Sequence, residues 1–337
     1  MSAPASRAGH GAGTPTLRVL SLGAGVQSTA LLILAARGDL EPLDAAVFAD
    51  TGWEPDRVYA HLDRIEAEVA RPAGIPILRV RNGHIREDAL DPAHRFASMP
   101  LYVRNADGQE GLARRQCTNE YKLKPLRWAV KALLGAPPGP DGRPGRVPAG
   151  RWAEQWIGIS ADESHRALDS KSTAYMPARW PLLERGLSRA DCAAINAAAG
   201  FPDTPKSACI GCPYHRNAQW RQMRDEHPDE WADAVAFDAA IRHGSARATA
   251  LGQPLRGQMY LHRSLLPLDQ APIDRITRTE WRTRQTDLLA ELSAATVAGQ
   301  LDDDEPVYGC GPHACRLPAD PDDPDEDTDT GPGTEAA

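Results

Sequence analysis

Short apolar runs alternate with helical segments between residues 17 and 80, and this alternation limits the fold more than any other feature of the sequence. The runs Leu17–Leu22, Ala45–Ala49 and Ile77–Val80 predict buried strands. The segments Ser28–Arg37 and Asp56–Val69 predict the helices between them. Alternating strands and helices form right-handed crossovers, which build a parallel sheet covered on both faces. We therefore expect a doubly wound, Rossmann-like α/β domain.

Further elements are predicted toward the C-terminus. The Pro/Gly-rich stretch Gly135–Gly150 reads as a loop, either an insertion or a boundary. A helix starts at Ser188, where Asp191 three residues later has the pattern of a capping box, and Gly200 closes it. The other expected elements are helices at Glu120–Leu134, Asp229–Ile241 and Leu288–Val297 and a strand at Trp156–Ile159.

Charge and composition divide the chain into parts. The formal net charge is −8, and much of it lies between Asp320 and Glu335, a Pro/Gly-rich stretch without apolar residues. Such a segment cannot bury enough surface to offset its ordering entropy. The expected parts are a disordered N-terminus (1–15), an α/β domain (16–185), a helical cysteine-bearing region (186–317) and a disordered acidic tail (318–337).

The sequence gives no sign of export or of membrane insertion. The N-terminal residues contain no apolar signal segment, and no apolar run approaches the ~20 residues of a membrane helix. We therefore expect a cytoplasmic protein, in which thiols stay reduced. Six cysteines in such a compartment are better explained by metal binding or catalysis than by disulfides.

The turn after the first predicted strand is rich in glycine, and Gly23 and Gly25 stand directly before a helix. A strand-to-helix turn of this kind exposes backbone N–H groups at a helix N-terminus, where they bind phosphate with the help of the helix dipole. The hydroxyl groups of Ser21, Ser28 and Thr29 add donors. The alternative is a tight turn that binds no ligand.

The second predicted strand runs into Asp50, Thr51 and Gly52. Ligands of open parallel sheets bind beyond the carboxyl ends of the strands, so these residues are expected beside the glycine-rich turn. The alternative is that Asp50 caps the following turn. A further run holds four cations between Arg114 and Lys124, a local concentration that suits an anionic substrate.

The motifs together resemble the PP-loop superfamily, and more closely its phosphoadenosine phosphosulfate reductase family. Residues Ser21 to Leu31, SLGAGVQSTAL, are similar to the loop S-x-S-G-G-K-D-S-T, with Val26 in place of the usual Lys or Arg and Gln27 in place of Asp. The family also carries a D-T-G like the one at Asp50. The resemblance implies an adenine nucleotide alpha-hydrolase type of fold that binds ATP or a sulfonucleotide.

Two more segments carry this resemblance. Residues 116–126 are similar to C-C-x-x-x-K-x-x-P-L, and residues 158–166 to G-x-x-x-x-E-S-x-x-R. Asp162 or Glu163 would hold Mg²⁺ or ribose hydroxyl groups, and Arg166 would pair with a phosphate oxygen. The resemblance implies nucleotide contacts from Ser21, Gly23, Ala24, Gly25, Gln27, Ser28, Thr29, Asp50, Thr51, Gly52, Gly158, Asp162 and Glu163, and catalytic roles for Arg166, Lys122 and Cys310.

The cysteines resemble those of adenylyl sulfate reductases and of the PP-loop enzymes of DNA phosphorothioation, which hold a 4Fe–4S cluster. Cys209 and Cys212 form a C-x-x-C, and Cys117 would be a third ligand, although Gln116 replaces the first Cys of the family's pair. The fourth ligand would come from Cys192, Cys310 or Cys315. The alternatives are a zinc ion held by Cys209, Cys212, Cys310 and Cys315, or no metal.

Cys310 also has a second interpretation. The segment Cys310-Gly311-Pro312-His313 is similar to the C-terminal E-C-G-x-H of sulfonucleotide reductases, whose Cys is the attacking thiol. Cys310 is therefore either this nucleophile, with Cys315 as the fourth metal ligand, or a ligand itself.

Three functions follow as hypotheses. The first is adenylation of a substrate by ATP with release of pyrophosphate, followed by sulfur transfer from a sulfur donor. The resemblance extends this to DNA or tRNA thiolation, with a partner protein presenting the nucleic acid because the chain is acidic overall. The second is a sulfonucleotide reductase that uses Cys310 and a thioredoxin-like reductant. The third is a nucleotide-binding module without turnover, given Val26 and Gln27.

Overall fold

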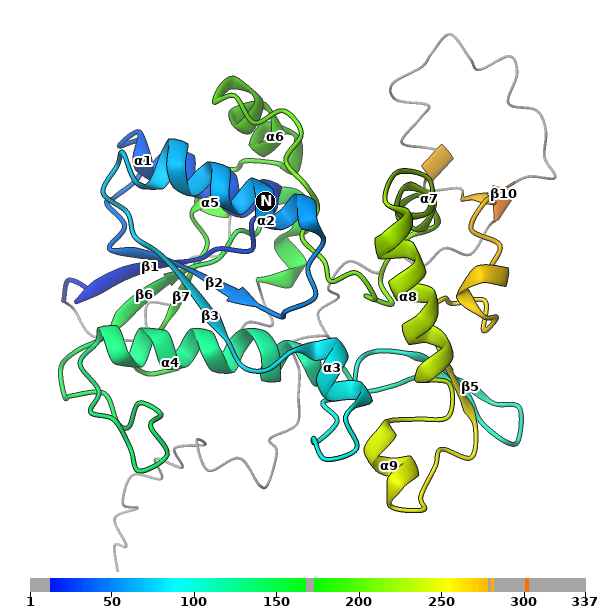
Figure 1. Cartoon of the computed structure of the whole chain (residues 1–337). Coiled ribbons are helices and arrows are strands. Elements are labelled where there is room, and N and C mark those ends of the chain that lie inside the picture. Colours follow the sequence, from blue (N-terminus) through cyan, green and yellow to red (C-terminus); the bar gives the residue numbers. More distant parts are fainter. Residues whose placement is uncertain (1–12, 168–172, 278–279, 282–300, 303–337) are drawn as a thin grey trace, which may run out of the picture.

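The computed structural model describes residues 13–167, 173–277, 280–281 and 301–302. Figure 1 shows two parts, a sheet with helices on both faces and a group of helices and short strands beside it. In these described ranges, no helix is long and apolar enough to cross a membrane. The predicted helix Leu288–Val297, the acidic tail and residues 1–12 lie outside the described residues.

A five-stranded parallel sheet forms the first part, in the order β3-β2-β1-β6-β7. At its centre Leu20 of β1 pairs with Ala46 of β2 on one side and with Trp156 of β6 on the other. The strands are β1 (Leu17–Ser21), β2 (Ala45–Asp50), β3 (Ile77–Arg81), β6 (Ala153–Trp156) and β7 (Ala178–Arg179).

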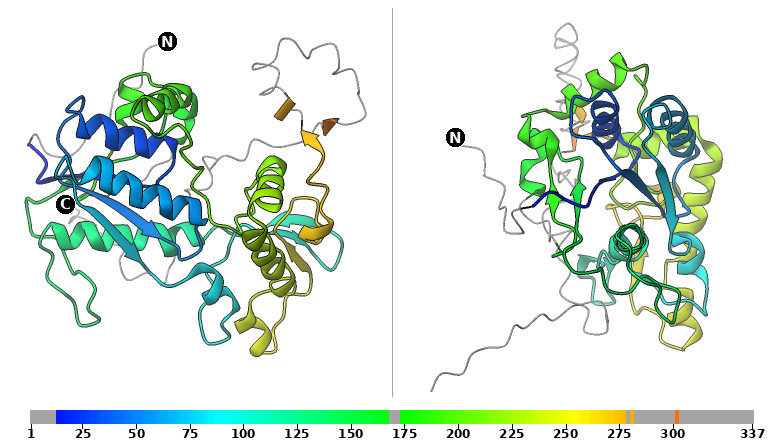
Figure 2. Two further views of the ribbon diagram at one scale, coloured as in Figure 1. Left: turned by 45° about the horizontal axis from the view of Figure 1, so that its top comes forward. Right: turned by 90° about the vertical axis from the view of Figure 1, so that its left-hand side faces the viewer.

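Apolar side chains cover both faces of this sheet. On one face Leu20 and Phe48 pack against the helices α1, α2, α5 and α6, and on the other Val19 and Val47 pack against α4. Figures 1 and 2 show these helices on opposite sides of the sheet. The prediction of a doubly wound α/β fold is thus confirmed. The helices are α1 (Val26–Ala36), α2 (Asp56–Ile65), α4 (Lys124–Leu133), α5 (Pro181–Glu184) and α6 (Arg189–Ala198).

Two predicted helices contain π-helical turns. The helix expected at Asp56–Val69 is α2 followed by a π-helix at Glu66–Ala70. The helix expected at Glu120–Leu134 is a π-helix at Asn119–Leu123 followed by α4. A π-turn takes one more residue than an α-turn, and such turns are frequent at functional sites.

The strand predicted at Trp156–Ile159 was wrong in its position, because β6 ends where that prediction begins. Its residues Glu154 and Gln155 are polar, which hid the strand in the sequence. The Gln155 side chain is buried and donates a hydrogen bond to Ser21 Oγ at 2.7 Å. Residues 157–160 instead form a loop beyond the carboxyl end of the sheet.

A second hydrophobic core lies beside the sheet and draws on two separate stretches of the chain. Trp53, just after β2, packs with Leu101, Trp220 and Phe237. A three-stranded antiparallel sheet, in the order β5-β4-β8, joins these stretches. Its elements are α3 (Ile85–Leu90), β4 (Tyr102–Arg104), β5 (Glu110–Leu112), α7 (Asn217–Glu226), α8 (Pro228–Ala240), α9 (Ala246–Ala250), β8 (Gln258–Tyr260) and a short 3₁₀ turn (Leu268–Gln270).

Smaller elements complete the fold. A 3₁₀ helix at Ala161–Arg166 follows β6, and β9 (Ile276–Thr277) pairs in parallel with β10 (Leu301–Asp302). The predicted capping box of α6 is confirmed, since Ser188 Oγ accepts from the Asp191 N–H at 3.2 Å while the Asp191 carboxylate accepts from the Ser188 N–H at 2.8 Å. The helix expected at Asp229–Ile241 is α8.

Candidate functional site

The strand order reverses between β1 and β6, and the candidate site lies at their carboxyl ends. From β1 the chain proceeds to β2 and β3 on one side, and it returns to β6 on the other. Connections that leave in opposite directions open a crevice where α/β proteins bind their ligands. The start of α1, directly after the glycine-rich turn, and Gly158 after β6 meet at this point.

The turn after β1 has an uncommon backbone conformation. Ala24 has a φ of 53°, a left-handed conformation that is uncommon for a residue with a Cβ atom. Ser28 Oγ accepts hydrogen bonds from the N–H groups of Gly23 at 3.2 Å and Gly25 at 3.3 Å. Helix α1 begins at Val26, and the N–H groups of its first turn have no intrahelical acceptor. The loop therefore presents hydrogen-bond donors at the positive end of a helix dipole.

Gly158, in the loop after β6, packs closely against the start of α1. A Cβ atom at this position would lie 3.0 Å from the Ser28 nitrogen and 3.1 Å from the Gln27 carbonyl carbon. These separations are shorter than ordinary van der Waals contact, so the backbone of residue 158 passes the start of α1 as closely as glycine allows. The segment after β6 and the start of α1 thus meet in space.

Gln27 links four segments of the chain. Its amide nitrogen donates to Glu163 Oε2 at 3.0 Å and to Ser160 Oγ at 3.4 Å, while its amide oxygen accepts from Arg189 Nη1 at 2.9 Å. Arg166 forms a salt bridge with the same Glu163 oxygen. Of the predicted residues, the structure therefore brings Gln27, Glu163 and Arg166 together, and it adds Arg189 from α6.

Both predicted carboxylates of the 3₁₀ helix have partners within the protein. Asp162 Oδ1 accepts from the Arg189 N–H at 2.9 Å. Burial alone would raise the pKa of Asp162, but hydrogen bonds from Ser160 and from the Arg189 N–H lower it overall. Asp162 thus connects the 3₁₀ helix to α6, and Glu163 connects it to α1. A further contact of either carboxylate with Mg²⁺ or ribose stays a prediction.

Two predicted hydroxyl groups take part in the packing around the sheet. Ser21 Oγ accepts from Gln155, which joins β1 to β6 directly below the loop. Thr29 is fully buried, and its hydroxyl lies 3.0 Å from His61 Nε2. The structure therefore places Ser28 at the loop, and Thr29 one residue further on in the core between α1 and α2.

Asp50 has partners in α2 and β3. Its carboxylate accepts from the Tyr59 hydroxyl at 2.7 Å and from the Gly52 N–H at 2.7 Å, and it forms a salt bridge with Arg81. Burial alone would raise the pKa of Asp50, but these donors hold it below its usual range. Asp50 thus orders the turn after β2, which agrees with the alternative interpretation of the sequence. This turn lies beside the loop that follows the neighbouring strand β1.

A second group of predicted residues gathers around Glu54. The Glu54 side chain is only 1% exposed, and its Oε1 accepts from Thr51 Oγ1 at 3.1 Å and lies 3.2 Å from Lys122 Nζ. Cys209 Sγ lies 3.2 Å from Thr51 Oγ1 and 3.6 Å from the same Glu54 oxygen. Burial would lower the pKa of Lys122, but the Glu54 carboxylate raises it overall, so this lysine stays charged.

The turn after β2 and the C-x-x-C segment fit closely against each other. The Trp53 carbonyl accepts from the Ile210 N–H at 2.8 Å. A Cβ atom on Gly211 would lie 2.1 Å from the Trp53 ring, so only glycine fits between Cys209 and Cys212 here. This contact explains the glycine of the C-x-x-C in terms of packing.

Of the cysteines in this region, Cys209 is buried and Cys117 and Cys212 are half-buried. Burial raises the pKa of Cys117 to about 11, with Cys212 near enough to contribute, and burial also raises the pKa of Cys209 well above its usual range. A thiol with so high a pKa is a poor nucleophile near neutral pH. Within the part of the chain described, no group of three or more His, Cys, Asp or Glu side chains is placed to hold a metal ion. The iron–sulfur and zinc hypotheses stay predictions.

The remaining cysteines lie elsewhere. Cys192 is buried on α6, in the core on the α1 side of the sheet, whereas Cys117 packs against the second core. Cys310 and Cys315 lie outside the described residues. The choice between nucleophile and metal ligand for Cys310 therefore stays open.

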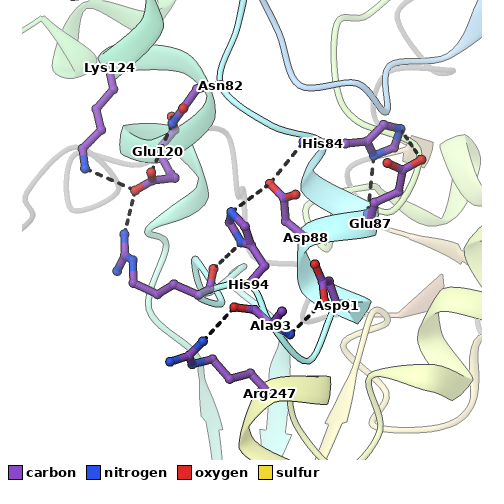
Figure 3. Close-up of polar contacts among 11 residues, drawn as sticks. Asn82, His84, Glu87, Asp88, Asp91, Ala93, His94, Glu120, Lys124 and Arg247 are labelled. Atoms are coloured by element: carbon purple, nitrogen blue, oxygen red, sulfur yellow. Dashed lines mark hydrogen bonds and ion pairs between the residues drawn. The ribbon is translucent and has the colours of Figure 1, made fainter. Parts of the chain in front are cut away.

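The two lysines of the predicted run of cations, Lys122 and Lys124, pair with different acidic residues. Lys124 pairs with Glu120 at 3.3 Å, and Arg95 pairs with the same carboxylate at 2.7 Å. Asn82 donates to the other Glu120 oxygen at 3.1 Å. Figure 3 shows Lys124 and Asn82 directed toward Glu120. With Lys122 bound to Glu54, both lysines of the run stabilise the fold through internal ion pairs.

Three residues at these two groups were not predicted. Arg189 is far from the loop in sequence, and only the packing of α6 brings it there. Glu54 follows Thr51 by three residues and stands between Trp53 and Pro55, in a stretch that also carries Asp50, Asp56 and Arg57, so the sequence did not single it out. His215 continues the C-x-x-C as C-x-x-C-x-x-H, and its Nε2 donates to the Cys209 carbonyl at 2.9 Å.

Two buried histidines predict a loss of stability in mild acid. Burial lowers the pKa of both His61 and His215 to about 4, from an ordinary value of 6.5. The unfolded chain then binds protons that the folded chain excludes, so this stability is complete above about pH 7 and is lost as the pH falls from 6.5 to 4. At pH 5 we expect each histidine to lower the free energy of unfolding by about 2 kcal/mol.

Urea unfolding at pH 7 and pH 5 measures this effect. His61→Gln should remove about half of the difference in unfolding free energy between the two pH values, and replacement of the exposed His243 should leave it unchanged. An equal loss of stability in the wild type and in His61→Gln would contradict the assignment.

Comparison with protein-family models, with curated proteins and with solved structures found no match. What the chain does must therefore be inferred from the geometry of its own residues.

Proposed function

We propose that this chain binds ATP through the Ser21–Thr29 loop and belongs to the PP-loop superfamily, in its phosphoadenosine phosphosulfate reductase family. One observation carries the proposal. The glycine-rich turn and the start of α1 lie at the reversal of strand order, where a Cβ atom on residue 158 would lie 3.0 Å from the Ser28 nitrogen. Helix N-termini at such crevices bind phosphate groups. The fold would then be of the adenine nucleotide alpha-hydrolase type.

The first turn of α1 would supply most of the phosphate contacts. Its free N–H groups run from Val26 to Ser28, and the helix dipole adds attraction for negative charge. Ser28 holds the turn in shape through the N–H groups of Gly23 and Gly25. These donors are fixed before the nucleotide arrives, so binding needs little reorganisation.

The reaction we propose is adenylation. A nucleophilic oxygen of the acceptor attacks the α-phosphorus of MgATP, the new oxygen–phosphorus bond forms, and the bond to the β-phosphate oxygen breaks. Pyrophosphate leaves, and the adenylated acceptor is activated for displacement of AMP by sulfur from a donor. Positioning and charge neutralisation are the protein's main tasks in such a step. Of the predicted catalytic residues, Arg166 is paired with Glu163, which contacts Gln27 at the start of α1, whereas Lys122 is paired with Glu54.

Reduction of a sulfonucleotide is the second candidate, for which the segment Cys310-Gly311-Pro312-His313 is the feature in the sequence. In that reaction the Cys310 thiolate would attack the sulfur, and the sulfur–oxygen bond to the nucleotide phosphate would break so that AMP or its 3′-phosphorylated form leaves. A thioredoxin-like dithiol would then release sulfite from the S-sulfocysteine and become a disulfide. The two candidates share the nucleotide site but differ in their products. Sulfite release that Cys310→Ser abolishes would favour the reductase.

Product analysis tests the proposal. With water in place of the acceptor, we expect slow conversion of MgATP to AMP and pyrophosphate in equal amounts. Ser28→Ala should reduce ATP affinity about tenfold, since it removes the acceptor that orders the loop. Ser98→Ala, which removes a hydroxyl bonded to the Met99 carbonyl, is the control. Formation of ADP and phosphate would contradict α-phosphate chemistry, and ATP binding without either product would favour a module without turnover.

A further inference from the structure

The proposed phosphate loop has no cationic side chain of its own. Between Ser21 and Thr29 the chain contains no Lys or Arg, and Val26 starts the helix. A triphosphate brings several negative charges into the crevice. N–H groups and a helix dipole compensate only part of such charge, and phosphate sites commonly add Lys or Arg. A cation from another segment is therefore expected near the loop.

Helix α6 brings Arg189 to this position. The Arg189 guanidinium donates to Gln27 Oε1 at 2.9 Å, and Gln27 is the second residue of α1. Two further contacts fix the helix against the loop. The Arg189 N–H donates to Asp162 Oδ1 at 2.9 Å, and the buried Asn196 donates to the Val26 carbonyl at 3.0 Å.

The two arginines of the crevice differ in their partners. Arg166 is paired with the Glu163 carboxylate, which compensates its charge. The Arg189 side chain bonds to a neutral amide oxygen, and among the described residues it forms no ion pair. Its charge also acts on the nearby Asp162 carboxylate and helps to lower the pKa of that group, while its remaining guanidinium N–H groups are available to an anion at the loop. Guanidinium groups bind phosphate oxygens through two parallel hydrogen bonds.

We infer that Arg189 is the cation that contacts the phosphate chain of the bound nucleotide, supplied from α6 in place of a loop lysine. This inference rests on the proposed nucleotide site. Gln27 has a defined part in it, since its amide oxygen holds the guanidinium beside the first turn of α1 while its amide nitrogen bonds to Glu163. Arg189, held in place by Gln27, thereby takes the place of a cationic residue in the loop.

Binding measurements on the full chain with ATP and with adenosine test this role. Arg189→Gln should weaken ATP binding about 10–100-fold, the value of one charge-assisted contact, and leave adenosine binding unchanged. Arg189→Lys keeps a positive charge but not the planar geometry, so its ATP affinity should fall between those of the wild type and Arg189→Gln. Arg185→Gln is the matched control, because Arg185 lies before α6 and donates to the Asp39 carbonyl.

The outcomes separate this inference from the proposed function. Absence of ATP binding by the wild type would overturn both. ATP binding by Arg189→Gln with wild-type affinity would overturn only the role of Arg189. An equal loss of ATP and adenosine binding would also overturn it, since that pattern indicates a general structural role. Loss confined to ATP, with partial rescue in Arg189→Lys, supports it.

Discussion

Replacing Gly158 with alanine is expected to weaken ATP binding about 10–100-fold, because the new methyl group would cover a phosphate donor. The added Cβ atom would lie 3.0 Å from the Ser28 nitrogen and 3.1 Å from the Gln27 carbonyl carbon. The loop must then move by a few tenths of an ångström, or the methyl group blocks the Ser28 N–H. Overpacking of this kind also costs about 1–3 kcal/mol of stability.

Titration with ATP, together with thermal unfolding, measures both effects. Gly111→Ala is the matched control, since a Cβ atom at that exposed position meets nothing within 4 Å. Wild-type ATP affinity in folded Gly158→Ala would show that phosphate does not bind in this crevice. Loss of stability without loss of affinity would likewise contradict the site.

Replacing Lys122 with methionine should lower the free energy of unfolding by about 2–3 kcal/mol. The cause lies with its partner, because the Glu54 side chain is 1% exposed and Lys122 Nζ lies 3.2 Å from its Oε1. Removing the lysine leaves a buried carboxylate without its counter-charge. A fully buried pair would lose about 3–5 kcal/mol, but the Lys122 side chain is 37% exposed and water screens part of the interaction.

The double variant Lys122→Met with Glu54→Gln distinguishes the ion pair from packing. It should recover most of the lost stability, because a neutral amide needs no counter-charge. Lys131→Met, on the exposed end of α4, is a control for loss of one lysine. Denaturant unfolding of the four proteins gives the comparison. An unstable double variant would show that Lys122 stabilises the protein through packing alone.

The sheet was predictable because its strands carry a strong local signal. β1 and β2 are mostly apolar runs with buried residues, β3 begins with the apolar pair Ile77 and Leu78, and the predicted bounds of all three differ from the observed ones by a residue at most. β6 was misplaced, because Gln155 is buried through a hydrogen bond to Ser21 rather than through apolar contact. The strands β4, β5 and β8 have three residues each, and long-range pairing rather than local pattern decides them.

The site was predictable where its residues follow a strand end. Gly23, Gly25 and Gly158 do so, and the topology brings them together. Arg189 was not predictable in this way, because nothing in the sequence at the start of α6 indicates which residue it faces. Thr51 and Asp50 are adjacent in sequence, yet the structure directs them to different partners, Glu54 and Arg81. Side-chain direction at a strand end depends on packing that the sequence pattern does not specify.

The central claim is that nucleotide phosphates bind at the glycine-rich turn and the first turn of α1, beside Gly158. The most direct test is a crystal structure of the full chain with a non-hydrolysable ATP analogue and Mg²⁺. We predict phosphate oxygens within hydrogen-bond distance of the Val26, Gln27 and Ser28 N–H groups, with the Arg189 guanidinium on the same phosphates. An analogue bound at any other place, with this crevice empty, would contradict the claim.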